Sequence, residues 1–322
     1  LTMYANRKMF FDGAVNTSIY NFNGRQLSFD YDKFSIDLVH IDSIKFTINT
    51  KDSITGRSKG TRQIDNKLSY SSGTLFIDSI SNKSSKNVYP QYPYFDANRG
   101  AYVYFNQADI LGGVYDTTVY FKIPPFDSDS MSSAQEKSVG FDGEFFSAGI
   151  FPPFEQKLVV MEDYSFGFEH SVPAEGYQTY GGDGVFFGTI RLDKQGLRGK
   201  GVIKYLNTVI ESSDFIFYTD SLVAVGTSFV TMAGTNDKIG ESVTFPQLGI
   251  ENYEVKWYPK EDSMLVKNLM NSFSFYDSTA TLTGAINISH KGMTGYGIFD
   301  RTGSRTVSPK FMFEQTSFTA RD

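Results

Sequence analysis

The sequence of 322 residues contains no cysteine, one tryptophan and three histidines. Without cysteine the chain has no disulfide bonds, no thiolate metal sites and no cysteine nucleophile. Charged residues make up 20% of the chain, below the roughly 25% of typical soluble domains. Apolar runs are only a few residues long, whereas a membrane-spanning helix needs about 20 consecutive apolar residues. No transmembrane helix is therefore predicted.

Clusters of basic residues are also missing. Lysine and arginine number 30 against 36 aspartate and glutamate residues, which gives a net charge of -6 and a pI near 5.2. An acidic chain without a basic tract lacks the charge that binds nucleic acid or an anionic membrane surface. Neither partner is expected.

The sequence has few of the motifs that carry catalysis. Its three histidines have no metal-ligand spacing, and no Gly-x-Ser-x-Gly motif is present. We interpret His40 and His170 as strand-end residues and His290 as a solvent-exposed turn residue. Gly199 and Gly201 lie inside an expected strand rather than before a helix, so they do not form a phosphate-binding turn. No cofactor is expected.

Aromatic residues are abundant. Thirty phenylalanines and 20 tyrosines bring the aromatic share to 16%, and aromatic side chains suit the pleated, half-buried surface of a strand. Short alternating runs are separated by polar turns along most of the chain. The sequence predicts an all-β fold of antiparallel hairpins, arranged in stacked sandwich or solenoid-like units.

Two segments of the chain are similar to each other. Residues 186–225 align without a gap onto residues 282–321 at an offset of 96, with ten identical pairs in forty positions. The identities fall mainly on glycine, serine and phenylalanine, the residue types that fix turns and fill cores. They are Gly188/Gly284, Ile190/Ile286, Gly196/Gly292, Gly199/Gly295, Gly201/Gly297, Ser212/Ser308, Phe215/Phe311, Phe217/Phe313, Ser221/Ser317 and Ala224/Ala320. We interpret this pattern as a tandem 96-residue repeat.

Each copy begins with a predicted β-hairpin. In the first copy, residues 188–192 and 197–203 alternate with period two around the polar turn 193–196. Glycines at strand positions 199, 201, 295 and 297 weaken a strand unless a bulge or an aromatic ring lies there. We expect one or the other at these glycines.

The sequence divides into two regions. We predict an N-terminal β-rich domain over 1–174 and a tandem β-repeat region over 175–322, separated by the glycine-rich stretch 173–184, and we expect the array to continue beyond the chain. Two helices are expected, at 132–138 and 263–273. Short strands are predicted at 10–15, 19–22, 27–31, 34–38 and 44–48 in the N-terminal domain.

One stretch contains candidate catalytic and sugar-binding residues. The carboxylates Asp163, Glu169 and Glu175 lie in a segment rich in aromatic residues and glycine. A paired-carboxylate glycosidase needs two such groups about 5 to 10 Å apart across a bound sugar. The alternative is a surface loop with ordinary charges. Three tyrosines of the same stretch are candidate ligand-binding residues: Tyr164, Tyr177 and Tyr180.

Two further groups of residues are candidate binding residues, one for calcium and one for sugar, and each also has a structural interpretation. Asp127 and Asp129 resemble the start of a calcium loop but lack the following glycine and terminal glutamate, so a turn or helix cap is the alternative. A second group of tyrosines could stack on sugars or cover a small core. These are Tyr89, Tyr92, Tyr94, Tyr102 and Tyr104.

Several longer motifs carry a family resemblance. They are GTLFID, NKS, YPYFDANRGAYVYFN, GIFPPF, DYSFGF, GLRGKG, VKWYPKEDSM and SPKFMF. Together they resemble segments of long, functionally unassigned β-rich cell-envelope proteins of Bacteroidota. The resemblance implies export to the periplasm, outer membrane or cell surface, and it supplies no catalytic residues.

The sequence favours a non-enzymatic structural or binding segment of a large exported protein. Its expected partners are neighbouring domains of the same long chain or other envelope proteins, with glycan as a further option. One alternative is a carbohydrate-binding or glycoside-hydrolysing module. Another is an open β-groove that carries lipid or polypeptide across the envelope.

Overall fold

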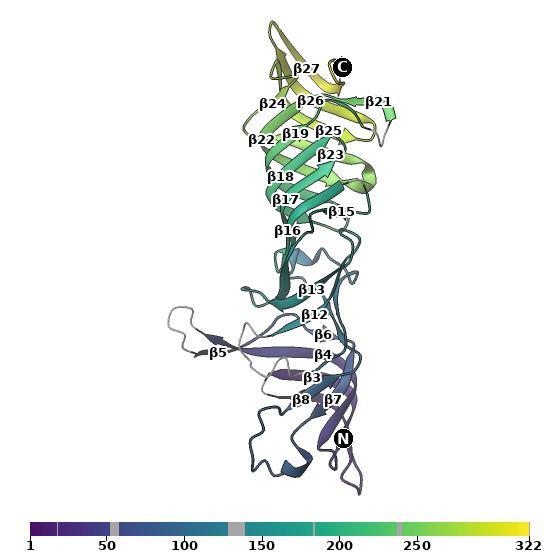
Figure 1. Cartoon of the computed structure of the whole chain (residues 1–322), viewed down its shortest axis with the longest axis vertical. Coiled ribbons are helices and arrows are strands. Elements are labelled where there is room, and N and C mark those ends of the chain that lie inside the picture. The colour runs from purple at the N-terminus through teal and green to yellow at the C-terminus, as the bar shows by residue number, and fades with distance from the viewer. Residues whose placement is uncertain (18, 52–57, 128–138, 183, 237–239, 322) are drawn as a thin grey trace. The chain divides into compact units, whose positions relative to one another are not determined.

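The computed structural model describes residues 1–322 except 18, 52–57, 128–138, 183, 237–239 and 322 (Figure 1). The described residues form antiparallel strands joined by turns and short 3₁₀ helices, which confirms the all-β prediction. In this part of the chain no helix is long and apolar enough to cross a membrane. The chain forms two compact units, one of residues 1–146 with 153–168 and the other of residues 147–152 with 169–322.

The first unit is built around the long strand β4. One edge of β4 pairs with β3, while its other edge pairs in turn with β7, β6 and β5. A second run of neighbours is β6, β9, β10, β12, β13 and β14. The elements are β1 (Thr2–Met3), β2 (Met9–Asn16), β3 (Tyr20–Asp30), β4 (Ser35–Lys51), β5 (Ser58–Gln63), β6 (Leu68–Ser69), β7 (Ser71–Phe76), η1 (Ile80–Asn82), β8 (Tyr94–Ala97), β9 (Ala101–Tyr104), η2 (Leu111–Gly113), β10 (Val119–Ile123), β11 (Phe126–Asp127), β12 (Gly140–Ser147), β13 (Phe154–Val160) and β14 (Phe166–Ser171).

The core of the first unit is largely aromatic. Phe46 contacts Phe141 and Phe166 edge to face, with ring centroids 5.7 and 5.5 Å apart. Phe145 packs against Phe168 in the same way at 4.9 Å. Such edge-to-face pairs are favourable beyond the area they bury. The phenylalanine content of the sequence therefore supplies the interior of this unit.

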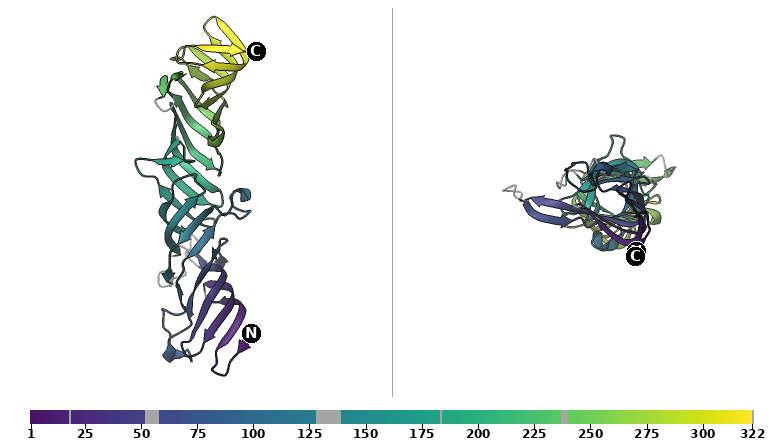
Figure 2. Two further views of the ribbon diagram at one scale, coloured as in Figure 1. Left: turned by 90° about the vertical axis from the view of Figure 1, so that its right-hand side faces the viewer. Right: turned by 90° about the horizontal axis from the view of Figure 1, so that it is seen from below.

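The second unit is an antiparallel sheet whose strands mostly follow chain order (Figure 2). The pairing runs β15, β16, β17, β18, β19, β22, β23, β25, β26, β27 and β28. Its elements are β15 (Tyr177–Thr179), β16 (Gly184–Asp193), β17 (Gly196–Tyr205), β18 (Thr208–Phe217), β19 (Leu222–Thr231), β20 (Gly234–Asn236), β21 (Gly240–Phe245), β22 (Leu248–Tyr258), η4 (Pro259–Glu261), β23 (Ser263–Asn268), β24 (Phe273–Phe275), β25 (Ala280–Ser289), β26 (Gly292–Arg301), β27 (Ser304–Phe313) and β28 (Phe318–Arg321).

Alternate residues of these strands face the core. Phe215 and Phe217 of β18 are fully buried, as are Phe311 and, nearly so, Phe313 of β27, whereas Met312 between them is 39% exposed. This alternation is the pattern expected of a sheet with one buried face. The prediction that the paired phenylalanines form the core is confirmed.

The predicted hairpin of residues 188–203 is present as β16 and β17, with Gly188 directly opposite Gly201. A Cβ on Gly188 would lie 2.1 Å from the carbonyl oxygen of Lys200, and its φ of +143° disfavours other residues. The pairing of β17 with β18 shifts register between Gly199 and Gly201. A Cβ on Gly199 would meet the ring of Phe217 at 2.7 Å. Both the expected bulge and the expected ring are found.

The predicted helices and the predicted short strands differ from the elements of the structure. The helix predicted at 263–273 is wrong, because this segment forms β23 and β24. Met264 and Val266 of β23 are buried while Lys267 is exposed, so period two prevails over the helical spacing. The helix predicted at 132–138 lies outside the described residues. The short strands predicted at 19–31 and 34–48 are in fact the single long strands β3 and β4.

Strand boundaries in the second unit recur at an offset of 96. The strands β15, β16, β17 and β18 begin and end 96 residues before β24, β25, β26 and β27, and β19 begins 96 residues before β28. The facing glycines of the first hairpin also recur, as Gly284 opposite Gly297. The register shift recurs between Gly295 and Gly297.

Candidate functional site

Two of the predicted site residues belong to the first unit. The carboxylate of Asp163 accepts hydrogen bonds from the backbone N–H and the hydroxyl of Ser165, at 3.0 and 2.6 Å. Its neighbour Tyr164 has a left-handed backbone, and the guanidinium of Arg62 lies 4.0 Å from the centre of its ring. Both residues thus stabilise the turn between β13 and β14.

Four predicted site residues belong to the second unit. Glu169 lines a surface hollow of about 760 Å³ together with Arg191 and Arg198, while Glu175 lies exposed in the loop before β15. The Tyr177 hydroxyl lies 2.9 Å from Nε2 of His170, and the two rings are stacked. Burial lowers the pKa of His170 and raises that of Tyr177, with the charge of Glu175 adding to the latter.

Tyr180 has a structural position. Its hydroxyl donates to the carbonyl oxygens of Tyr218 and Ser221, at 3.0 and 2.5 Å, in the turn between β18 and β19. Its ring packs edge to face on Trp257 at 5.7 Å. The predicted catalytic and tyrosine residues are therefore distributed over two units. The hydrogen bonds of Asp163, Tyr177 and Tyr180 stabilise turns and strand ends.

The calcium-loop candidates do not form a described site. Asp127 lies in β11 opposite Asp96 of β8, and Asp129 lies outside the described residues. Over the described part of the chain, no group of three or more aspartate, glutamate or histidine side chains could hold a metal ion.

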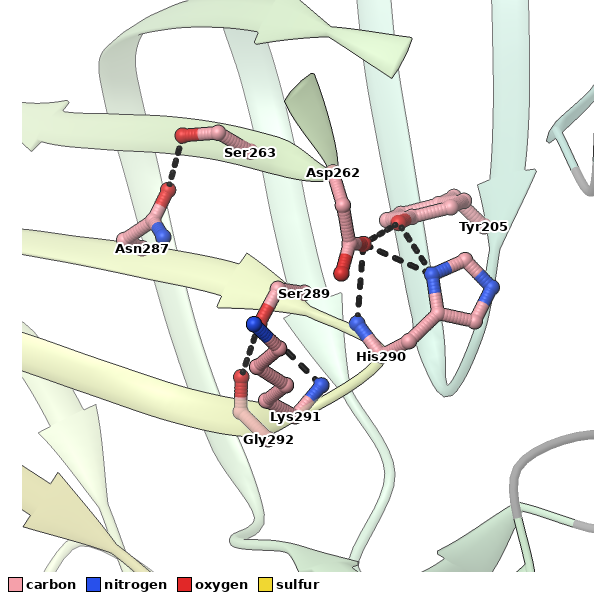
Figure 3. A network of polar contacts seen from close by, with 8 residues as sticks. All are labelled: Tyr205, Asp262, Ser263, Asn287, Ser289, His290, Lys291 and Gly292. Atoms are coloured by element: carbon pink, nitrogen blue, oxygen red, sulfur yellow. Dashed lines mark hydrogen bonds and ion pairs between the residues drawn. The ribbon is translucent and has the colours of Figure 1, made fainter. Parts of the chain in front are cut away.

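A polar network near the end of β17 joins three segments that are distant in the sequence (Figure 3). Oδ1 of Asp262 accepts a hydrogen bond of 2.9 Å from the backbone N–H of His290 and lies 2.6 Å from Nδ1 of the same residue. It also accepts a bond of 3.2 Å from the hydroxyl of Tyr205. Burial alone would raise the pKa of Asp262, but the hydrogen bonds from His290 outweigh it and lower the pKa.

His290 lies in the turn between β25 and β26, as predicted, and in addition takes part in this network. Its side chain is 39% exposed and is paired with Asp262, which caps η4 in a left-handed conformation. The ring of Tyr205 packs in turn against Trp257, with centroids 4.9 Å apart. The network connects the turn of β25 and β26 to the ends of β17 and η4, and we interpret it as stabilising the fold.

A different group of residues, on the outer face of the first unit, forms a further candidate for a binding site. The aromatic cluster of the first unit consists of Tyr70, Tyr102, Tyr104, Tyr120 and Phe146. Tyr104 lies directly opposite Tyr120 across β9 and β10, with ring centroids 6.1 Å apart. Tyr120 stacks on Phe146 of β12 at 4.7 Å, and Tyr102 lies 5.9 Å from Tyr120. Tyr70 meets Tyr104 edge to face and is 72% exposed.

The cluster faces away from the core. On β9, Ala101 and Val103 are buried while Tyr102 and Tyr104 between them are half exposed. On β10, Val119 and Phe121 are buried in the same way around Tyr120. Burial raises the pKa of Tyr104, with the neighbouring tyrosine hydroxyls adding to the effect. The outward side of β9 and β10 therefore presents tyrosine rings and hydroxyls toward solvent.

Two surface hollows lie near the cluster: one includes Tyr70 and Tyr104, and the other includes Lys122, which lies directly opposite Tyr102. The Tyr70 hollow has a volume of about 470 Å³ and is lined by Tyr70 and Tyr104 together with polar groups that include Lys67, Asn106 and Gln107. The β12–β13 hollow has a volume of about 700 Å³ and is lined by Lys122, Pro124, Asp142, Gly143, Glu144, Glu155, Gln156 and Lys157. Apolar rings are thus placed beside hydrogen-bonding side chains, a combination typical of ligand sites.

Only two residues of this cluster, Tyr102 and Tyr104, are predicted from the sequence. The alternation of β9 identified Tyr102 and Tyr104, but nothing local linked them to Tyr70, Tyr120 or Phe146. Tyr89, Tyr92 and Tyr94 from the same predicted group are not in the cluster, and Tyr94 stacks on Phe76 instead, at 5.6 Å. Comparison of the chain with protein-family models, with curated proteins and with solved structures finds no match.

Proposed function

We propose that this chain is a non-enzymatic structural or binding segment of a large exported cell-envelope protein, and that its second unit contains a tandem duplication of a 96-residue β unit. The observation that carries the proposal is the agreement of four consecutive strands in their first and last residues at an offset of 96. A duplicated unit that pairs strand to strand with its neighbour extends a sheet without requiring a catalytic centre.

Side-chain roles support the duplication as well. The hydroxyl of Ser212 accepts a bond from the backbone N–H of Asp214 at the register shift of β18, and Ser308 does the same for Lys310 at 3.0 Å. Both serines also donate to a carbonyl oxygen of the next strand, that of Val225 or Arg321. Identical residues thus perform identical structural tasks in the two segments.

Packing supports a structural role over an open lipid groove. A groove that carries lipid needs apolar side chains that are accessible along its inner face. In the second unit, inward residues such as Phe186, Ile190, Ile286 and Phe311 are fully buried by one another and by their neighbours. The inner face is occupied by the protein's own side chains.

The placement of two predicted catalytic carboxylates, Asp163 and Glu175, supports a non-enzymatic role for these residues. Asp163 accepts hydrogen bonds within its own turn, and Glu175 is exposed in a loop of the other unit. A glycosidase would need a carboxylate pair fixed across a sugar-binding cleft. Export itself rests on the resemblance to envelope proteins.

Two measurements test the proposal. The purified chain is incubated with a panel of polysaccharides, and new reducing ends are measured; none are expected. Hydrolysis that disappears in Asp163→Asn or Glu169→Gln would overturn the non-enzymatic role. Fractionation of the native cells with an antibody to the chain tests export, and recovery in the cytoplasmic fraction alone would contradict it.

A further inference from the structure

We propose that the aromatic cluster and the two hollows near it form a carbohydrate-binding site for a neutral polysaccharide chain. The inference deepens the proposed binding role and rests on it, but it does not depend on the tandem duplication. The site lies wholly within the first unit, on the solvent side of β9, β10 and β12.

These rings are not needed to fill the core of the first unit. Outward positions of a sheet with one buried face are ordinarily polar. The core beneath the cluster is filled by Ala101, Val103, Val119 and Phe121, none more than 1% exposed. Four aromatic rings on the solvent side of β9, β10 and β12, with the exposed Tyr70 beside them, therefore need another explanation, because exposed apolar patches mark binding surfaces.

The side chains of the cluster match the chemistry of a sugar. One face of a pyranose ring presents C–H groups that pack on an aromatic ring, while its hydroxyls need hydrogen-bond partners. Tyrosine offers both a ring and a hydroxyl, and four of the five cluster residues are tyrosine. The hollows add the amides of Asn106 and Gln107 at one end and carboxylates and lysines at the other. The cluster contains no aliphatic side chain.

The charges of the β12–β13 hollow favour an uncharged ligand. In the β12–β13 hollow, Glu144 lies directly opposite Glu155, and Asp142 lies opposite Lys157. Two like charges facing each other across strands are unfavourable in a sheet. Hydroxyl donors of a sugar would bind such carboxylates, whereas a polyanion would be repelled by them. The hollow therefore fits a neutral polysaccharide.

The extent of the site favours a chain over a single sugar. The rings occupy β9, β10 and β12, which are successive neighbours, and neighbouring strands lie about 4.8 Å apart. One hollow is lined by Tyr70 and Tyr104, and the other lies near the cluster on the β12 side. A ligand that contacts all of these groups must run across the strands.

Affinity electrophoresis of the full chain tests the inference. The gels contain soluble glucan, mannan or xylan as neutral probes, and polygalacturonate as the anionic probe. We expect retardation by at least one neutral probe and none by polygalacturonate. Tyr102→Ala combined with Tyr120→Ala should weaken binding about tenfold or more, as contact aromatics do at binding sites. Glu144→Gln combined with Glu155→Gln keeps every ring and should also weaken binding.

The matched control is Tyr296→Ala, which removes an exposed tyrosine of the second unit (47% exposed) and should leave retardation unchanged. Circular dichroism and thermal unfolding establish that each variant is folded. Absence of retardation by every neutral probe would overturn the inference, as would retardation that both double variants retain. Self-association of the chain that is lost in the tyrosine variant, without retardation, would identify a protein interface instead. None of these outcomes alters the hydrolysis or fractionation results that test the proposed function.

Discussion

The hydroxyl of Tyr276 donates a hydrogen bond of 2.6 Å to the carbonyl oxygen of Ser317. Ninety-six residues earlier, the hydroxyl of Tyr180 donates the same bond to Ser221. Both tyrosines have a left-handed backbone, with φ of 50° and 57°, and both bind the turn that follows the phenylalanine strand. Burial raises the pKa of Tyr276 to about 12, with the charge of Glu314 adding to the effect. The Tyr276 hydroxyl therefore keeps its proton at physiological pH and can donate this hydrogen bond.

Removing either hydroxyl should destabilise the chain. Tyr180→Phe and Tyr276→Phe each leave two turn carbonyls without this donor, at a cost of about 1 kcal/mol. We expect the larger loss for Tyr180→Phe, because its bonds are less exposed to water than those of Tyr276. Urea unfolding measures both losses. The control Tyr296→Phe should be neutral, and equal neutrality of all three variants would contradict the structural role.

The facing glycines of the hairpin should not tolerate a side chain. In Gly188→Ala the new Cβ would lie 2.1 Å from a backbone oxygen at a φ of +143°, so we expect a loss of about 3 kcal/mol or more. Gly303→Ala is the matched control, since its φ is +80° and no atom lies within 4 Å of the new Cβ. It should cost only about 1 kcal/mol. Equal losses would show that the backbone conformation alone, and not the close approach, requires glycine.

The phenylalanine strands should be sensitive on one face only. Phe313→Ala removes a ring that is 2% exposed, and truncation of a buried phenylalanine costs about 3 to 5 kcal/mol. Met312→Ala, at the neighbouring outward position, removes a side chain that is 39% exposed and should cost less than about 1 kcal/mol. Thermal and urea unfolding compare the two. A larger loss for Met312→Ala would reverse the assignment of the faces.

The hydrogen bonds between Asp262 and His290 should make the free energy of unfolding depend on pH. The hydrogen bonds from His290 lower the pKa of Asp262 below its ordinary value of 3.8. A carboxylate with a lowered folded-state pKa stabilises the fold above its unfolded-state pKa and loses this contribution as the pH falls through the folded value. Asp262→Asn should therefore destabilise the chain by about 1 kcal/mol at neutral pH, and the difference from wild type should shrink below pH 3.8.

The control for this prediction is Glu251→Gln, which changes an exposed carboxylate of β22. Unfolding is followed in urea from pH 7 down to the acid range for wild type and both variants. A wild-type advantage over Asp262→Asn that persists unchanged into strong acid would contradict the linkage.

The sequence predicts the hairpins well because their signals are local. Alternation, a polar turn and paired glycines identify residues 188–203 without knowledge of the rest of the chain. The aligned window began at residue 186, so the identical tyrosines at 180 and 276 fell outside it although the same offset relates them. The helix predicted at 263–273 failed because a spacing of four residues coincided with the alternation that buries Met264 and Val266.

The candidate site was harder to predict because pairing between distant strands creates it. Tyr104 and Tyr120 become neighbours only through the register of β9 and β10. The contact of His290 with Asp262 is not predicted by the sequence, because Asp262 lies 28 residues earlier, at the end of a 3₁₀ helix. Neither contact leaves a periodic signal in the sequence.

The proposed duplication of one β unit in the second half of the chain can be tested in its core. Phe186 pairs with Ile203 in the proposed first copy and Leu282 pairs with Phe299 in the proposed second copy, so each pair contains one ring and one aliphatic side chain. A double-mutant cycle of Leu282→Phe and Phe299→Ile tests the claim directly. Each single change should cost about 1 to 3 kcal/mol, whereas the double variant reproduces the first copy's pair and should cost clearly less than their sum. Strictly additive losses in urea unfolding would contradict the account.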